Sequence, residues 1–190
     1  MEMTGAVRIA APRAKVWAAL NDPGILKEAI PGCQELTRLS DTEMSAVVAT
    51  KVGMVRATFT GAVILTNIVP NVSYTITGEG KGGAAGFAKG GADVSLADDG
   101  AGTKLTYTAK GQVGGKLAQI GARLIDATAK QMADQFFAAF AERVSAGPIA
   151  RAEHAVEEAV EDAASAVAET AREVEEGAEK AAIRGFLGGP

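Results

Sequence analysis

The 190-residue chain is short of the residues on which disulfide, zinc and acid–base sites depend. It contains one cysteine, Cys33, and one histidine, His154. One cysteine cannot form an internal disulfide, and one cysteine with one histidine cannot complete a structural zinc site. Acid–base catalysis near neutral pH most often uses histidine, so a catalytic site would need His154 to fold back onto the core. We therefore expect a protein that is not an enzyme.

Basic charge and long apolar runs are also scarce. The formal net charge is -4, which argues against a nucleic-acid binder with a basic surface. No run of about 18 apolar residues occurs, so no helix is expected to span a bilayer. The first residues lack the apolar run of a secretory signal. These observations predict a cytoplasmic protein without a nucleic-acid partner.

The composition changes near Gly147 and Pro148. Residues 1–147 carry most of the glycines and a slight excess of basic residues, whereas residues 148–190 are rich in alanine and glutamate. A proline there interrupts a helix, so we expect a folded domain over 1–147 and an acidic helical tail over 148–190. The tail is either a solvated helix or a coiled coil with a thin heptad seam. It ends in a short apolar tip that could contact a membrane interface, formed by Ile183, Phe186 and Leu187.

Alternating apolar residues predict a series of strands within the first domain. The strands are expected at 3–11, 35–39, 43–52, 55–69, 73–77, 87–96 and 103–113, with short helices at 12–20 and 25–30. Consecutive strands with short turns form an antiparallel meander. A stripe at spacings of 3 and 4 then predicts one helix from about 117 to 144, roughly 29 residues or 43 Å long. The fold class is therefore α+β.

A glycine-rich stretch lies between the fifth and sixth predicted strands. Gly78 to Gly83 matches the pattern G-x-G-x-x-G, but an alternating, strand-like segment follows instead of a helix, so we expect no nucleotide site. Glycine within strands marks bulges and sharp bends, which would curve the sheet. Small inward residues and an aromatic content of 5% then leave two alternatives open, an apolar cavity or a filled core.

Several motifs resemble the carbon monoxide dehydrogenase G-subunit family in order and spacing over about residues 1–144. They are the segments 16–23, 30–33, 51–53, 59–61, 78–81, 85–90, 102–105, 114–118, 121–125 and 136–137. That family belongs to the START-like, helix-grip superfamily. The resemblance implies a curved antiparallel sheet wrapped around a long C-terminal helix, with a hydrophobic cavity between them.

The resemblance also implies an accessory role. Members of the family are thought to recruit or couple a molybdenum-containing carbon monoxide dehydrogenase to the membrane and to carry a quinone, menaquinone or ubiquinone. They hold no molybdenum themselves, so we expect no intrinsic cofactor and a location in the cytoplasm or peripherally on the inner face of the cell membrane. Two alternatives remain, a purely structural adaptor for a molybdenum hydroxylase and a cyclase or hydrolase of the same superfamily.

The candidate ligand-binding residues occupy inward strand positions and the helix stripe, and they are Phe59, Val63, Tyr74, Phe87, Tyr107, Leu117, Ile120, Leu124, Met132 and Phe136. Either tyrosine could donate a hydrogen bond to a quinone carbonyl. For the adaptor role, the candidate docking residues lie in the glycine-rich loop and are Gly82, Gly83 and Gly86. No catalytic or metal-binding residue is predicted.

Overall fold

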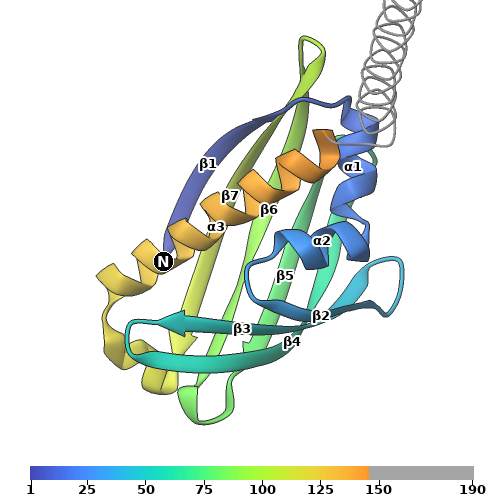
Figure 1. Cartoon of the computed structure of the whole chain (residues 1–190). Helices are drawn as coiled ribbons and strands as arrows, with labels where there is room; N and C mark the ends of the chain where they lie inside the picture. The colour runs from blue at the N-terminus through green and yellow to red at the C-terminus, as the bar shows by residue number, and fades with distance from the viewer. Residues whose placement is uncertain (146–190) are drawn as a thin grey trace, which may run out of the picture. The chain divides into compact units, whose positions relative to one another are not determined.

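The computed structural model describes residues 1–145, which form a seven-stranded antiparallel sheet crossed by one long helix (Figure 1). The strands are β1 (Glu2–Ile9), β2 (Cys33–Arg38), β3 (Glu43–Val52), β4 (Val55–Val69), β5 (Ser73–Lys81), β6 (Phe87–Asp99) and β7 (Gly102–Gly114). The α-helices are α1 (Arg13–Leu20), α2 (Pro23–Ala29) and α3 (Ala122–Ser145), and the 3-10 helices are η1 (Gly83–Ala85) and η2 (Gly115–Ile120). The predicted tail, its apolar tip and His154 lie outside the described residues.

The sheet has the strand order β1-β7-β6-β5-β4-β3-β2, and every neighbouring pair is antiparallel. Strands β2 to β7 follow one another as the meander that the alternation predicts. Strand β1 completes the sheet at the other edge by pairing with β7, with Val7 opposite Leu105. The α+β prediction is therefore confirmed, with α3 lying across the sheet as the gripped helix (Figure 1).

The long helix begins five residues later than the apolar stripe predicts. Gly121 has a φ of 102°, a conformation that side chains rarely adopt and that interrupts helical geometry. Residues 115–120 therefore form the separate helix η2, and α3 has 24 residues. Periodicity missed this break because a 3-10 turn places apolar residues at similar spacings.

The two short helices connect β1 to β2 at one end of the sheet. Asp22 caps α2, because its Oδ1 accepts hydrogen bonds from the backbone N–H groups of Gly24 (2.8 Å) and Ile25 (3.3 Å). This cap, with Pro23 in the first turn, starts the helix two residues before the predicted position. The chain before α1 is fixed by Thr103, whose buried hydroxyl donates to the carbonyl of Ala11 at 2.6 Å.

The fully packed core occupies one end of the space between the sheet and α3. There the last residues of β1 and the first of β7 meet the C-terminal half of α3, so that Ile9, Leu105 and Phe140 have no exposed surface. Tyr74 is also buried there, and its ring meets Trp17 edge to face at a centroid distance of 5.5 Å. We call this region the packed end.

Burial raises the pKa of Tyr74 from 10.0 to about 12. Because the folded pKa is the higher one, we expect the contribution of Tyr74 to stability to be constant below about pH 10. It should fall by roughly 2–3 kcal/mol between pH 10 and 12, as the unfolded chain loses its proton first. Urea unfolding from pH 9 to 12 should show this slope in the wild type and lose it in Tyr74→Phe. Tyr107→Phe is the control and should keep the slope.

Candidate functional site

The concave face of the sheet is less densely packed away from the packed end. Strand register identifies the inward positions there. Val48, Phe59 and Val63 at those positions keep part of their surface accessible to solvent, whereas Met44, opposite Val63, is buried. Met132 and Phe136 of α3 are half-buried in the same way, and Met132 Sδ lies 3.8 Å from the hydroxyl of Thr50 on β3. We call this region the open end, defined by Val48, Phe59, Val63, Met132 and Phe136.

A band of glycines forms the floor of the concave face beside the open end. In adjacent strands Gly61 pairs with Gly80, and Gly78, Gly90 and Gly111 stand opposite one another in a second row. All five occupy inward positions, so this floor is bare backbone. We call it the glycine floor.

Two of these glycines are required by close contact between strands. A Cβ atom on Gly61 would lie 2.1 Å from the carbonyl oxygen of Glu79, and one on Gly90 would lie 2.2 Å from that of Lys110. No side chain fits at such distances, because the backbones themselves are in contact. The prediction that glycines bend the sheet is consistent with this geometry, and the same residues leave the floor without side chains.

Phe59 and Val63, both predicted ligand contacts, lie against glycines of β5 and of the turn that follows it. A Cβ on Gly78 would lie 2.7 Å from Val63 Cγ1, and one on Gly82 would lie 2.7 Å from Phe59 Cε1. The absence of a side chain at Gly82 therefore gives the ring of Phe59 room to extend toward the turn at η1. Both residues are half-buried on the concave face.

A groove of about 550 Å³ runs between β1 and α3. Tyr107 forms part of its wall, stacked on Phe137 with ring centroids 5.0 Å apart. The ring fits because Gly5 lies beneath it, where a Cβ would approach within 2.6 Å. Both Phe137 and the groove were missed from the sequence, and the signals were Gly5 within a strand and Phe137 next to the apolar stripe.

The rim of this groove is charged. Asp126, Lys130 and Asp134 line it from successive turns of α3. Lys130 Nζ donates a hydrogen bond to Asp134 at 2.7 Å, and that bond raises the pKa of the lysine. The groove thus combines an apolar wall with a polar entrance, an arrangement common in sites for small apolar molecules.

The remaining predicted ligand residues are divided among three places. Tyr74 belongs to the packed end and Leu117 of η2 is buried. Ile120 and Leu124 lie next to Gly53 at the β3–β4 turn, where Leu124 is 43% exposed. Of the predicted ligand residues, Phe59 and Val63 on β4 and Met132 and Phe136 on α3 are the half-buried ones that define the open end, and these others lie elsewhere.

Phe87 does not occupy the inward position that we expected for it. Strand register pairs it with Gly114, in the phase opposite to Val94, so it lies on the outer face. A Cβ on Gly114 would approach its ring within 2.2 Å, and Lys89 Nζ lies 6.0 Å from the ring centroid. The prediction failed because the turn at η1 sets the phase of β6, which alternation alone does not fix.

The three predicted docking glycines have different surroundings. Gly82 makes room for Phe59, and Gly86 has a φ of 106° with its backbone against Gly114. Gly83 also has a positive φ of 58°, but nothing lies within 4 Å of the position of its Cβ. Gly82 and Gly86 are thus needed by the fold itself, and Gly83 faces open space.

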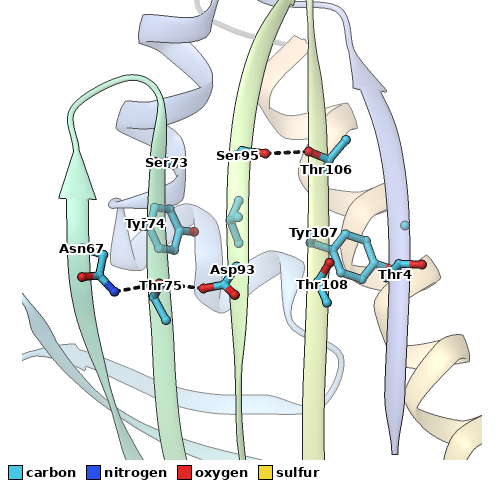
Figure 2. A pocket seen from close by; sticks show the side chains of 12 residues that line it. Thr4, Asn67, Ser73, Tyr74, Thr75, Asp93, Ser95, Thr106, Tyr107 and Thr108 are labelled. Atoms are coloured by element: carbon cyan, nitrogen blue, oxygen red, sulfur yellow. Dashed lines mark hydrogen bonds between the residues drawn. The ribbon is translucent and has the colours of Figure 1, made fainter.

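The outer face carries a polar hollow of about 510 Å³ over β5, β6 and β7 (Figure 2). On one side of it, Thr75 accepts a hydrogen bond from Asn67 Nδ2 (3.3 Å) and donates one to Asp93 Oδ1 (2.7 Å). Ser95 and Thr106 share another at 2.6 Å. The hydroxyl lining makes this face chemically unlike the apolar concave face.

Among residues 1–145, no group of three or more histidine, cysteine, aspartate or glutamate side chains is placed to hold a metal ion. The chemistry available on the concave face is burial of apolar surface, with one phenol and a charged rim at the groove. That chemistry suits binding of an apolar molecule with a polar end.

Comparison with known proteins agrees with the fold. The carbon monoxide dehydrogenase G-subunit (CoxG) family matches residues 5–145. A conserved protein from Geobacillus kaustophilus is 28% identical with a TM-score of 0.71, covering 76% of this chain and 95% of its own.

More distant solved structures share the fold alone. A START superfamily protein from Mycobacterium smegmatis is 15% identical (TM-score 0.58, covering 75% of this chain and 96% of its own). The ZhuI aromatase/cyclase from Streptomyces sp. R1128 is 16% identical (TM-score 0.57, covering 77% and 94%). No curated protein matches the chain.

Substitutions in the glycine floor test whether neighbouring strands are in direct backbone contact there. We expect Gly90→Ala to lower the free energy of unfolding by roughly 1–3 kcal/mol, because its methyl group would meet the Lys110 carbonyl. Gly80→Ala is the matched control, since its Cβ would lie an ordinary 3.5 Å from Phe59 Cβ. That variant should be neutral or about 0.4–1 kcal/mol more stable. Equal urea midpoints for both variants would contradict the strand contact.

Proposed function

The chain belongs to the CoxG family, and we propose that its open end binds the isoprenoid chain of a quinone on behalf of a molybdenum-containing partner enzyme. The family and the START-like fold support an accessory role in binding a hydrophobic ligand. Our proposal adds two identities to this role, a quinone as the ligand and a molybdenum-containing enzyme as the partner. The observation that carries it is the half-buried apolar lining of the open end beside the bare glycine floor.

The energetics favour an apolar ligand at this place. Each Å² of apolar surface removed from water contributes about 25 cal/mol, so an isoprenoid chain can bind without polar contacts. Phe59, Val63, Met132 and Phe136 present apolar surface that remains accessible in the folded chain. A ligand in contact with them would bury that surface together with its own.

A quinone ring needs a hydrogen-bond donor, and Tyr107 supplies one. Its phenol belongs to the wall of the β1–α3 groove, beside the charged Lys130 on the rim. The hydroxyl can donate to a quinone carbonyl while Phe137 holds the ring in place. Tyr74, the other tyrosine, packs against Trp17 in the core and serves the fold.

The accessory role also concerns the partner and the membrane. In the part of the chain that the structure describes, no helix has the length and hydropathy to cross a bilayer. We propose that the partner is a molybdenum hydroxylase of the carbon monoxide dehydrogenase type, and that Gly83 in the exposed η1 turn contributes to docking it. The predicted membrane contact through Ile183, Phe186 and Leu187 stays a prediction.

An enzymatic role remains the second candidate, because one structural neighbour is an aromatase/cyclase. Such a role requires polar groups around a bound substrate. The open end offers apolar side chains, and the carboxylates Asp126 and Asp134 lie on the rim of the groove. Turnover of a bound compound by the purified protein, lost in Asp126→Asn with binding intact, would favour the enzyme over the carrier.

Native mass spectrometry after incubation with menaquinone or ubiquinone tests the carrier directly. We expect one quinone per chain in the wild type and at least tenfold weaker uptake in Ala88→Leu, because Ala88 faces inward beside Gly80 and leucine would fill the space. Ala97→Leu is the matched control on the exposed face of the same strand and should bind normally. If the wild type takes up neither quinone, nor any from a lipid extract, the carrier proposal is wrong. Co-purification with a molybdenum hydroxylase would then favour the adaptor.

The role of Tyr107 is tested by Tyr107→Phe, which removes the hydroxyl and keeps the stacked ring. Loss of one hydrogen bond of about 1 kcal/mol should weaken quinone binding about fivefold. An alkane-chain ligand of the same length without carbonyl groups should bind both proteins equally. Equal quinone affinity in the two proteins would place the ring elsewhere.

A further inference from the structure

The tip of the β3–β4 hairpin carries the most exposed large apolar side chain among the residues described. Met54 is 94% exposed in the two-residue turn between Val52 and Val55, next to Gly53 with its φ of 59°. We propose that this tip docks on the surface of an anionic lipid bilayer, with Met54 entering the interface and basic side chains contacting the lipid phosphates.

Two cations stand directly behind Met54. Lys51 and Arg56 are opposite one another in the register of the hairpin, and both are exposed. Like charges in facing positions destabilise a strand pair, so an anion bound between them would relieve a repulsion. They line one hollow of about 460 Å³ together with small side chains of the same two strands. The hollow is of a size and charge to accept a phosphate headgroup.

The charge of the tip is not neutralised by neighbouring acids in sequence. No aspartate or glutamate occurs between residues 44 and 78, a range that includes all of the β3–β4 hairpin except Glu43 at the start of β3, or between residues 100 and 125. The second segment contains Arg123, exposed and adjacent to Leu124, which contacts Gly53. Within residues 1–145, the ion pairs formed involve other cations.

The tip is also connected to the open end. A Cβ on Gly53 would lie 2.9 Å from Leu124 and 3.6 Å from Ile120, and farther along the hairpin Thr50 meets Met132. An apolar molecule leaving the bilayer at the tip would therefore meet Leu124 and Ile120 first and then Thr50 and Met132, where β3 and α3 are in contact and the open end begins. This entry route rests on the proposed function, whereas the lipid contact does not.

A bilayer fits these features better than an acidic protein partner does. An exposed methionine beside phosphate-binding cations gains free energy by entering an interface without a complementary pocket. Each basic residue near an anionic surface adds to the attraction, which weakens as salt increases.

Vesicle flotation of the full-length chain tests the proposal. We expect binding to vesicles of phosphatidylcholine and phosphatidylglycerol (3:1), little binding to phosphatidylcholine alone, and weaker binding in 0.5 M salt. The double variant Lys51→Glu/Arg56→Glu should lose at least tenfold in vesicle affinity, and Met54→Asp about threefold or more. Circular dichroism and thermal unfolding should show both variants folded, and Lys51→Gln/Arg56→Gln gives a milder form of the charge change.

The matched controls lie at another exposed turn. Leu39 is 56% exposed after β2, so Leu39→Asp and Arg38→Glu repeat the same changes there and should leave binding within twofold. If the tip variants bind vesicles as the wild type does, or the wild type binds neither vesicle, the proposal is overturned. Retention on an acidic protein without any vesicle binding would assign the tip to a protein partner.

Quinone uptake separates this result from the proposed function. Tip variants should take up quinone from detergent micelles normally but more slowly from vesicles. If wild-type protein floats with vesicles, loses this in Met54→Asp and binds no quinone, the lipid contact is supported and the carrier proposal is wrong. Equal uptake of quinone from vesicles by the tip variants and the wild type would reject the entry route.

Discussion

Close contact between neighbouring backbones at the glycine floor is the constraint on which the rest of the molecule depends. At Gly61 and Gly90 the strands approach so tightly that a Cβ would overlap a carbonyl oxygen of the next strand. Only glycine permits this approach, and a strand pair that makes it bends strongly. Curvature therefore arises from the absence of side chains, and the same absence leaves room on the concave face.

The molecule consequently has two ends with opposite packing. At the packed end, Phe140, Leu105 and Ile9 fill the space and supply stability. At the open end, the chain provides glycine where other sheets carry Val or Ile, and Phe59 covers only part of the floor. Three of the few aromatic residues, Trp17, Tyr74 and Phe140, lie at or next to the packed end, and Phe136 of the open end stacks on Phe140 with ring centroids 5.6 Å apart. The packed end thus supplies most of the buried core, and the region proposed to bind the ligand adjoins it at Phe136.

Much of this arrangement could be predicted from the sequence, because alternation and turn residues are local signals. They defined the strands, the meander and the α+β class, and the motifs indicated the family. Three features could not be predicted. The start of α3 depends on the φ of Gly121, the outward position of Phe87 on the turn at η1, and the β1–α3 groove on a contact between Gly5 and Tyr107. The first two depend on the backbone conformation of a turn, which alternation of apolar residues does not specify, and the third depends on a contact between strands that are far apart in sequence.

The hairpin tip departs from what stability alone favours. A lysine facing an arginine across two strands costs free energy, and an exposed methionine contributes little to folding. One acidic residue beside the two cations would relieve this repulsion. On α3, for comparison, Lys130 is paired with Asp134. Unpaired positive charge beside an exposed methionine is favourable in contact with an anionic bilayer. The lipid phosphates then neutralise the cations, and the apolar interior of the bilayer buries the methionine. The glycine floor bends the sheet at the strands from which this hairpin extends. The same close contact between backbones therefore affects both the open end and the position of the proposed lipid contact.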